Sequence, residues 1–350
     1  MSGNRELKSS FGIVVIGRNE GPRLQRCLES LGAATAHTIY VDSGSTDGSI
    51  SLAHRFRTNV VELDTSIPFC AARARNAGYQ RLKELDPKVS FVQFIDADCE
   101  LVNTWMTFAI ELILLQPDVA MVAGWLRERH PDVSIYNRLG DLEWNSSAAG
   151  EVDSVGGVAL ARCDAFDSVS GFDPTVAAGE EPELCQRLTH RGWRILRLDR
   201  EMATHDLAMT RFSQWWRRMV RAGYGSMDVA HRFRVTRFII ATRRVQGWTI
   251  WLMVVVVMGI TSLLLASRDI AVANAVLLGM WPVQIFRIAL RTQNKGHPWS
   301  IAASYAFLMA ISFLPQALGQ LRYLADRLYN GSNRLIEYKT PAQSKDDPHR

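Results

Sequence analysis

The chain has only five cysteines among its 350 residues, and no two of them form a Cys-x-x-Cys pair. Their number is odd, and they are scattered at positions 27, 70, 99, 163 and 185. We therefore expect neither a disulfide framework nor a zinc site, and a reducing cytoplasm fits this cysteine usage. The first residues are polar and contain no apolar run, so no cleaved signal peptide is predicted.

Two common nucleotide-binding motifs are also missing. The apolar run 11–17 is typical of a first buried strand, but no Gly-x-Gly-x-x-Gly follows it. The Gly-x4-Gly-Lys-Ser/Thr pattern of a P-loop occurs nowhere in the chain. These absences argue against a dinucleotide-binding Rossmann domain and against a P-loop enzyme.

The apolar residues are unevenly distributed. Hydrophobic residues make up 47% of the chain and charged ones 21%, so the composition as a whole is globular. From about residue 247 onward the chain becomes strongly apolar. Trp248–Ala266 is long enough to span a bilayer, and Ile270–Ile285 is a second candidate. Trp299–Leu321 is a third, with Pro315 as a candidate kink, so the region 247–325 is predicted to contain two to three transmembrane helices.

The basic residues predict how these segments are oriented. The ends before the first span and after the second carry Arg243, Arg244, Arg287, Arg291 and Lys295. The positive-inside rule places both ends in the cytoplasm. A full third crossing would export Arg322, Arg327 and Arg334, against that rule. Either the third segment is re-entrant or interfacial, or the rule is broken here.

The region 211–246 has nine arginines between Arg211 and Arg244 and a single acid, Asp228. Aromatic and apolar residues alternate with them, largely on one helical side, which is typical of helices lying in a membrane interface. Nucleic-acid binding is the competing interpretation of such a stretch. The apolar segments that follow favour the membrane, so we expect no nucleic-acid partner.

The first 125 residues alternate between strand and helix patterns. Apolar runs at 11–17, 38–41, 59–63, 91–95 and 120–124 predict strands, and helical periodicity between them predicts a parallel sheet covered on both faces. Right-handed crossovers would bring the residues after three of these strands to one edge. They are Asn19 and Glu20, Asp42, and Asp96 with Asp98. Carboxylates in such a place suit a hard divalent cation.

Five motifs follow one another in this region: Arg18-Asn19-Glu20; Leu24 with Cys27-Leu28-Glu29-Ser30-Leu31; Val41-Asp42-Ser43-Gly44-Ser45-Thr46-Asp47-Gly48; Ala74-Arg75-Asn76-Ala77-Gly78; and Asp96-Ala97-Asp98. In this order and spacing they resemble the family 2 inverting glycosyltransferases of the GT-A fold, of the membrane-anchored, bacterial polysaccharide-synthesis type. The resemblance covers about residues 11–240. It implies an α/β fold with a mixed sheet and helices on both faces, followed by interfacial and transmembrane helices.

The resemblance also implies ligands. The donor would be a nucleotide-diphosphate sugar (a UDP- or GDP-sugar), and the cofactor would be Mg²⁺ or Mn²⁺. Donor contacts would come from Asn19, Glu20, Asp42, Ser43, Gly44, Arg75, Asn76 and Asp96. Asp98 would ligate the metal, with His205 as an added metal or diphosphate contact. From the residues alone, Asp42 could equally be a turn cap, Arg75 a solvated helix position and His205 a structural histidine.

The second half of the domain has its own chemical landmark, Glu180-Glu181-Pro182. Proline suits the first turn of a helix and acids are favoured there by the helix dipole, so an acidic N-terminal cap is the plain interpretation. The resemblance implies instead that Glu181 is the general base, where the family usually has aspartate, with Glu180 as the competitor. A single base that deprotonates the acceptor hydroxyl is what an inverting transfer needs.

Acceptor contacts are predicted at several positions. The run 155–162 is expected to be a strand whose glycines, Gly156 and Gly157, allow close backbone approach. Gln214-Trp215-Trp216-Arg217 partly resembles the Gln-x-x-Arg-Trp motif of processive polysaccharide synthases. Arg218 stands where that motif has tryptophan, which leaves processivity open. Gln214, Trp215 and Arg217 complete the predicted acceptor set.

The sequence thus predicts five regions. They are a polar tail at 1–10, a catalytic domain at 11–210 (nucleotide-binding half 11–125, acceptor half 126–210), interfacial helices at 211–246, a membrane region at 247–325 and a polar tail at 326–350. We expect a metal-dependent, inverting glycosyltransferase of the hexosyltransferase type. Its lipid-linked or polysaccharide acceptor would be met at the cytoplasmic face of the inner (cytoplasmic) membrane, which the chain crosses more than once.

Two alternatives remain. A nucleotidyltransferase on a similar sheet would release pyrophosphate, although its glycine-rich basic first loop is missing here. A catalytically inactive membrane scaffold would be expected to have lost a motif acid, whereas Asp42, Asp96, Asp98 and Glu181 are all acidic.

Overall fold

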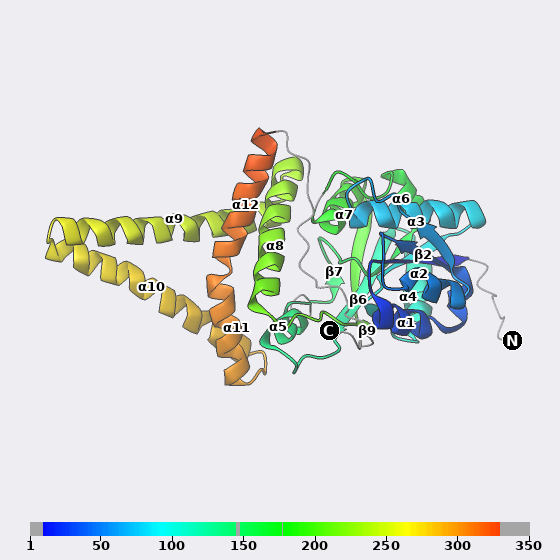
Figure 1. Cartoon of the computed structure of the whole chain (residues 1–350), viewed down its shortest axis with the longest axis horizontal. Coiled ribbons are helices and arrows are strands. Elements are labelled where there is room, and N and C mark those ends of the chain that lie inside the picture. The colour runs from blue at the N-terminus through cyan, green and yellow to red at the C-terminus, as the bar shows by residue number, and fades with distance from the viewer. Residues whose placement is uncertain (1–9, 145–147, 177, 330–350) are drawn as a thin grey trace. The chain divides into compact units, whose positions relative to one another are not determined.

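The computed structural model describes residues 10–144, 148–176 and 178–329 (Figure 1). The described residues form two compact units, one containing 10–131 and those between 140 and 208, and the other containing 132–139 and 209–329. The tails predicted at 1–10 and 326–350 lie largely outside the described residues. No sequence pattern predicts that 132–139 belongs to the second unit.

The first unit is built on one nine-stranded sheet with the order β3-β2-β1-β4-β8-β6-β9-β5, and β7 pairs with β9. Its strands are β1 (Phe11–Gly17), β2 (Thr38–Asp42), β3 (Asn59–Glu62), β4 (Phe91–Asp96), β5 (Cys99–Leu101), β6 (Val119–Glu128), β7 (Gly150–Glu151), β8 (Ala159–Arg162) and β9 (Arg194–His205). Its helices are α1 (Gly21–Ser30), the 3-10 helix η1 (Gly32–His37), α2 (Ser49–Arg55), α3 (Ala71–Leu85), α4 (Trp105–Leu115), α5 (Ile135–Trp144, which begins in the second unit), α6 (Cys163–Ser168) and α7 (Glu180–His190).

The sheet is mixed, which confirms the fold implied by the resemblance and corrects the all-parallel sheet predicted from alternation. Strands β3, β2, β1 and β4 are parallel to one another, but β8 is antiparallel to both β4 and β6. Leu160 of β8 faces Gln93 on one side and Val122 on the other. The strand predicted at 120–124 therefore does not lie beside the one at 91–95. The alternation of strands and helices along the chain gives only their order in sequence. It therefore does not predict that β8, which comes later in the chain, lies between β4 and β6 in the sheet.

Three predicted strand boundaries were wrong. The run 155–162 is extended only from Ala159, and Gly156 and Gly157 lie in the preceding loop. Glycine has no side chain to pack on a sheet, which weakens strand pairing at these positions. Strand β6 runs on to Glu128, well beyond the predicted end at residue 124, and β9 runs on to His205, although the apolar pattern predicts a strand only over 194–198. They pair along this length because register shifts absorb the mismatch between them.

The core of the first unit lies on both faces of the sheet. Ile13, Val14 and Val15 of β1 are fully buried, as is Ile95 of β4. Helix α3 approaches the sheet closely at Gly78, where a Cβ atom would lie 2.4 Å from Val14. This close packing fixes the start of α3 near the carboxyl ends of the strands.

The second unit is helical, with α8 (Phe212–Phe233), α9 (Thr236–Leu264), α10 (Arg268–Gln293), α11 (Trp299–Ile311) and α12 (Phe313–Leu328). Three stretches are long and apolar enough to cross a membrane: Thr236–Leu264, Arg268–Gln293 and Trp299–Leu328. Helix α9 passes without a break through the boundary predicted at 246. The third stretch breaks at Ser312, three residues before Pro315, because the proline ring clashes with the carbonyl group four residues earlier.

Candidate active site

Asp98 and His205 are brought together by a strand pairing that the sequence did not predict. Strand β5 follows Asp98 directly and pairs antiparallel with the end of β9, which sets Cys99 opposite His205. The N–H of Asp206 donates to the carbonyl of Asp98 at 2.9 Å and closes the pairing. As a result Nε2 of His205 lies 3.3 Å from Oδ2 of Asp98, and both side chains are buried.

These side chains can hold a divalent metal ion. One ligand atom each from Asp98, Cys99 and His205 lies within 4.8 Å of the others. Burial raises the pKa of the Cys99 thiol well above its usual value, so this sulfur stays protonated and is a poor ligand. A buried carboxylate facing an imidazole remains, which is a donor set suited to Mg²⁺ or Mn²⁺.

Glu128 is a buried acid beside this pair, and it is not among the site residues predicted from the sequence. It lies opposite His205 in the pairing of β6 with β9, and its Oε2 is 4.0 Å from Nδ1 of His205. Its carboxylate accepts hydrogen bonds from the N–H groups of His130 and Leu207, both at 3.1 Å. The ring of Trp144 meets the other side of the imidazole edge-on, with centroids 4.5 Å apart. Glu128 ends its strand as Asp96 ends β4, but the strand had been predicted to stop at residue 124.

A second acidic centre surrounds Arg75 at the start of α3. Its Nη2 lies 3.0 Å from Oδ1 of Asp96 at the end of β4. Its Nη1 lies 3.1 Å from Oε1 of Glu180 and 3.4 Å from Oε1 of Glu181, both in the first turn of α7. Arg75 is almost fully buried, so it is not the solvated helix position that its sequence context allowed. One cation thus faces three carboxylates, and the centre has excess negative charge.

The two neighbouring glutamates differ in environment. The side chain of Glu180 is 4% exposed and that of Glu181 is 19% exposed, so Glu181 is the more accessible of the two. Burial and the charge of Glu180 raise the pKa of Glu181 to about 7, while Arg75 opposes the shift. A carboxylate with such a pKa can accept a proton near neutral pH.

Gly157 makes room for this centre. A Cβ atom at Gly157 would lie 2.1 Å from Nη2 of Arg75 and 3.1 Å from Oε1 of Glu181. At Gly156 the same atom would meet nothing within 4 Å. The loop before β8 therefore passes directly over the Arg75 guanidinium, and only glycine fits at position 157.

The loops after β1 and β2 are tied to each other. Oδ1 of Asn19 accepts the N–H of Thr46 at 2.7 Å, and the N–H of Asn19 donates to Oγ of Ser45 at 2.9 Å. Asn19 adopts a left-handed conformation with φ of 56°. Beside it, Glu20 pairs with Arg23 at 2.6 Å.

Asp42 orders the turn that follows β2. Its Oδ2 accepts the N–H groups of Gly44 at 2.9 Å and Ser45 at 2.7 Å, and its Oδ1 accepts the hydroxyl of Tyr40 at 3.0 Å. The Oγ atom of Ser43 is buried and has no hydrogen-bond partner among the residues that the structure describes. Asp42 therefore caps this turn, as its sequence context allowed, and leaves the Ser43 hydroxyl available to a ligand.

Residues 12–169 match the sequence profile of the Glycosyl transferase family 2. These residues form a family 2 glycosyltransferase domain. The chain is 28% identical over 211 residues to the succinoglycan biosynthesis protein ExoA of Rhizobium meliloti (strain 1021), covering 56% of this chain and 63% of ExoA. It therefore spans less than two thirds of that relative. It is 21% identical over 254 residues to the glycosyltransferase AglE of Haloferax volcanii, covering 69% of this chain and 79% of AglE.

A solved structure shows the same fold. The mannosyltransferase PcManGT from Pyrobaculum calidifontis, in complex with GDP-Man and Mn²⁺, has a TM-score of 0.55 at 16% identity. The match covers 90% of this chain and 88% of PcManGT. The likeness establishes the GT-A fold for this chain.

Some predicted site residues have other partners or lie outside the glycosyltransferase domain. Both ends of the Asn76 amide are bound by the backbone of Phe172, with Nδ2 2.7 Å from its carbonyl oxygen and Oδ1 3.0 Å from its nitrogen. Gln214, Trp215 and Arg217 lie on α8, in the second unit. Oε1 of Gln214 accepts the N–H groups at the start of α8, Trp215 is fully buried, and Arg217 is exposed.

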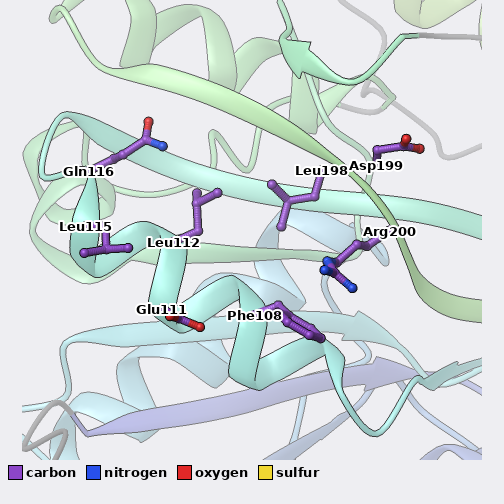
Figure 2. Close-up of a pocket in the computed structure, with 8 residues that line it drawn as sticks. All are labelled: Phe108, Glu111, Leu112, Leu115, Gln116, Leu198, Asp199 and Arg200. Atoms are coloured by element: carbon purple, nitrogen blue, oxygen red, sulfur yellow. The ribbon is translucent and has the colours of Figure 1, made fainter. Parts of the chain in front are cut away.

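A pocket of about 370 Å³ lies elsewhere in the domain, between α4 and β9 (Figure 2). Its lining includes Leu112, Leu198 and Arg200, and the Arg200 guanidinium lies 3.8 Å from the centre of the Phe108 ring. None of the predicted site residues of the glycosyltransferase domain lines this pocket. The candidate active site is therefore defined by the sequence motifs and by the side-chain contacts around Asp98 and Arg75, and this pocket is not part of it.

Proposed function

We propose that this protein is a metal-dependent, inverting glycosyltransferase of the hexosyltransferase type. It moves a sugar from a nucleoside-diphosphate donor to a lipid-linked or polysaccharide acceptor at the cytoplasmic face of a membrane. The observation that carries the proposal is that one domain holds a carboxylate–imidazole pair, Asp98 with His205, and a separate acidic centre with an accessible glutamate, Glu181. The first suits a metal-bound diphosphate and the second a general base.

Asp98 and His205 would hold the Mg²⁺ or Mn²⁺ ion. When bound, the ion neutralises the negative charge that develops on the departing nucleoside diphosphate. The donor set supports this assignment because a buried carboxylate and an imidazole face each other 3.3 Å apart. PcManGT, which shares the fold, was solved with GDP-Man and Mn²⁺, and this favours the same kind of ligand here.

The donor is proposed to bind along the loops after β1, β2 and β4. Glu20, Asp42 and the turn with Ser43 and Gly44 would shape the nucleoside site, and Asn19 locks the two loops together. Asp96 would accept hydrogen bonds from the donor. Arg75 holds Asp96 in place through its 3.0 Å contact. The same guanidinium also contacts Glu181, so the proposed donor site and the proposed general base share one cation.

Glu181 is the proposed general base. The acceptor hydroxyl attacks the anomeric carbon while its proton passes to the Glu181 carboxylate, and the bond from carbon to the diphosphate oxygen breaks. The nucleoside diphosphate leaves with the bonding electron pair. Because one displacement replaces one bond on the opposite face, the anomeric configuration inverts. Glu180 is less suited to the role because its carboxylate is buried against Arg75.

Membrane attachment and the acceptor class rest on the second unit. Three stretches there are long and apolar enough to cross a membrane, and they follow the arginine-rich helix α8. ExoA, a relative, is a succinoglycan biosynthesis protein, which supports an acceptor of the polysaccharide or lipid-linked class. Gly156, Gly157, Gln214, Trp215 and Arg217 stay the proposed acceptor contacts.

A donor screen tests the proposal. The purified full-length protein would be incubated with UDP- and GDP-sugars and Mn²⁺ or Mg²⁺, and the nucleotide products separated. We expect nucleoside diphosphate from at least one donor. A parallel incubation with nucleoside triphosphates and sugar 1-phosphates covers the alternative, because formation of a nucleotide sugar and pyrophosphate there would indicate a nucleotidyltransferase. Diphosphate binding without turnover across the whole panel would indicate an inactive scaffold.

A further inference from the structure

Helices α9 and α10 have the surface of membrane-spanning segments. Only 6% of the apolar window of α9 is buried and none of that of α10, so their side chains face outward almost completely. Within the second unit they extend side by side away from α8 and α12 (Figure 1). Nε1 of Trp251 donates to the carbonyl of Leu277 at 3.2 Å and links the two helices. Such apolar surface requires lipid around it.

The third apolar stretch, Trp299–Leu328, is different. In it, 39% of the apolar window is buried, and a break at Ser312 divides it into helices of 13 and 16 residues. At about 1.5 Å per residue these helices are roughly 20 and 24 Å long. Each is shorter than the hydrocarbon core of a bilayer, which is about 30 Å thick. Neither half is long enough to cross alone.

Helix α12 packs along α8 in the same direction. A Cβ atom at Gly319 would lie 2.1 Å from the carbonyl oxygen of Val220, so the two backbones are in direct contact. Further along, the rings of Tyr224 and Tyr323 stack edge-on with centroids 5.5 Å apart. The two helices therefore lie side by side, and α12 lies at the same depth as α8.

Helix α8 is too highly charged to lie in the hydrocarbon core. Its 22 residues include Arg217, Arg218, Arg221, Asp228 and Arg232. Charged side chains at the bilayer centre cost several kcal/mol each. The end of α12 is polar as well, because Nη1 of Arg327 lies 2.8 Å from Nδ1 of His231 on α8. The α8–α12 pair is therefore excluded from the hydrocarbon core.

The outer side of α12 has the pattern of an interfacial helix. The residues toward α8 include Gly319 and Tyr323, whereas four leucines on another side are exposed: Leu314, Leu321, Leu324 and Leu328. Exposed Arg322 lies next to this leucine stripe. A leucine stripe flanked by arginine fits the boundary between acyl chains and anionic phosphate headgroups.

We infer that only α9 and α10 cross the membrane, and that α8 and α12 lie together in the headgroup region of the face where α9 begins. Two crossings return the chain to that same face. Arg322 and Arg327 then stay in the cytoplasm, which removes the conflict with the positive-inside rule. The inference rests on the proposed membrane attachment and not on the proposed chemistry.

Cysteine labelling of the full-length protein in right-side-out membrane vesicles tests the topology. The background is Cys70→Ser, because the other four cysteines are buried. Arg268→Cys reports the α9–α10 connection, Asn294→Cys the end of α10 and Leu328→Cys the end of α12. An impermeant maleimide should label position 268 in closed vesicles, and positions 294 and 328 only after the vesicles are opened.

Two results would overturn the inference, and they differ. Labelling of position 328 in closed vesicles would show a third crossing while leaving the chemistry untouched. Protection of position 268 would show that α9 does not cross, and membrane attachment as proposed would fail with it. Donor turnover measured on the same vesicles reports the proposed chemistry independently.

A depth measurement tests the headgroup placement without relying on sidedness. Nitroxide labels at Leu314→Cys, Leu321→Cys and Leu328→Cys would be compared for accessibility to oxygen and to a polar nickel chelate in anionic phospholipid vesicles. An in-plane helix gives three similar depths. A spanning helix changes depth by about 10 Å for every seven residues, and such a gradient would contradict the proposal.

Discussion

Nη1 of Arg75 lies 3.1 Å from Oε1 of Glu180, so one buried cation joins the start of α3 to the first turn of α7. The same guanidinium reaches Asp96 at 3.0 Å. Burial and the charge of Glu180 raise the pKa of the neighbouring Glu181 to about 7, although Arg75 opposes the shift. The two adjacent glutamates therefore differ in environment, and in the proposed mechanism only Glu181 accepts a proton.

The first prediction concerns pH. The pKa of Glu181 is raised to about 7, so its carboxylate is the dominant form only above that pH. The kcat/KM value should therefore fall about tenfold per pH unit below this point. A profile of kcat/KM against pH measures it. An acidic limb at the ordinary glutamate pKa, or none, would contradict the assignment of Glu181 as the base.

The second prediction concerns Gly157, which lies against the Arg75 guanidinium. Gly157→Ala puts a methyl group 2.1 Å from Nη2 of Arg75, so the guanidinium must shift and the acid centre with it. We expect kcat/KM to fall at least about tenfold, since an ångström of misplacement can cost that much or more. Gly247→Ala, in α9, is the control, because its methyl group would meet nothing within 4 Å and Gly247 is not a proposed site residue. Equal activity of both variants would show that the loop does not define the site.

The third prediction concerns the metal. Asp98→Asn removes the charge of the proposed ligand and should weaken Mn²⁺-dependent binding of nucleoside diphosphate by at least about 100-fold. Titration calorimetry with and without Mn²⁺ measures this directly, without a substrate turnover. Asp86→Asn, at the C-terminal end of α3 and outside the proposed site, is the control. It should bind the nucleoside diphosphate and Mn²⁺ as the unmodified protein does. Unchanged Mn²⁺ dependence in the Asp98 variant would remove the metal assignment.

Glu128 supplies the fourth prediction. Its carboxylate lies 4.0 Å from Nδ1 of His205, where it can set the orientation of the ring. Acids that orient a metal-binding histidine typically contribute about 10- to 100-fold in metal affinity. Glu128→Gln should weaken Mn²⁺ binding within that range, and the exposed Glu111→Gln should not. If Mn²⁺ affinity is unaffected in the Glu128 variant, Glu128 serves only to bind the backbone of His130 and Leu207.

The contact between α8 and α12 yields the fifth prediction. At Gly319 an added methyl group would lie 2.1 Å from the backbone of Val220, whereas at Gly279 it would meet nothing within 4 Å. Overpacking of this kind costs about 1–3 kcal/mol. Gly319→Ala should therefore lower the Tm of the detergent-solubilised protein by several degrees relative to Gly279→Ala. Equal Tm values would show that the two helices are not in close contact.

The sequence predicted the part of the site that depends on local pattern. Asp42 and Asp96 follow buried apolar runs, and the structure places both at strand ends because β2 and β4 are parallel neighbours of β1. The order of five motifs predicted the family before any geometry was known. Glu181 was predicted at the start of a helix from its proline neighbour, and α7 does begin there.

The remainder depends on contacts between distant residues. The proximity of Asp98 to His205 requires β5 to pair with the last three residues of β9, which lie more than a hundred residues later in the chain. A three-residue strand such as β5 carries no periodicity that a sequence could reveal. Glu128 matters only through partners in other elements, so its local pattern does not mark it. The pattern predicts close backbone approach at Gly157, but not that Arg75 and Glu181 are the neighbours there.

The most direct test of the central claim is transfer to an acceptor by two neighbouring variants, Glu181→Gln and Glu180→Gln, in the same assay. Nucleoside diphosphate release and the configuration of the product would be measured with the donor found in the screen. We predict an inverted product from the unmodified protein, loss of at least about 1000-fold in kcat for the Glu181 variant, and a smaller loss for the Glu180 variant. Full activity of the Glu181 variant, or a product with retained configuration, would contradict the account.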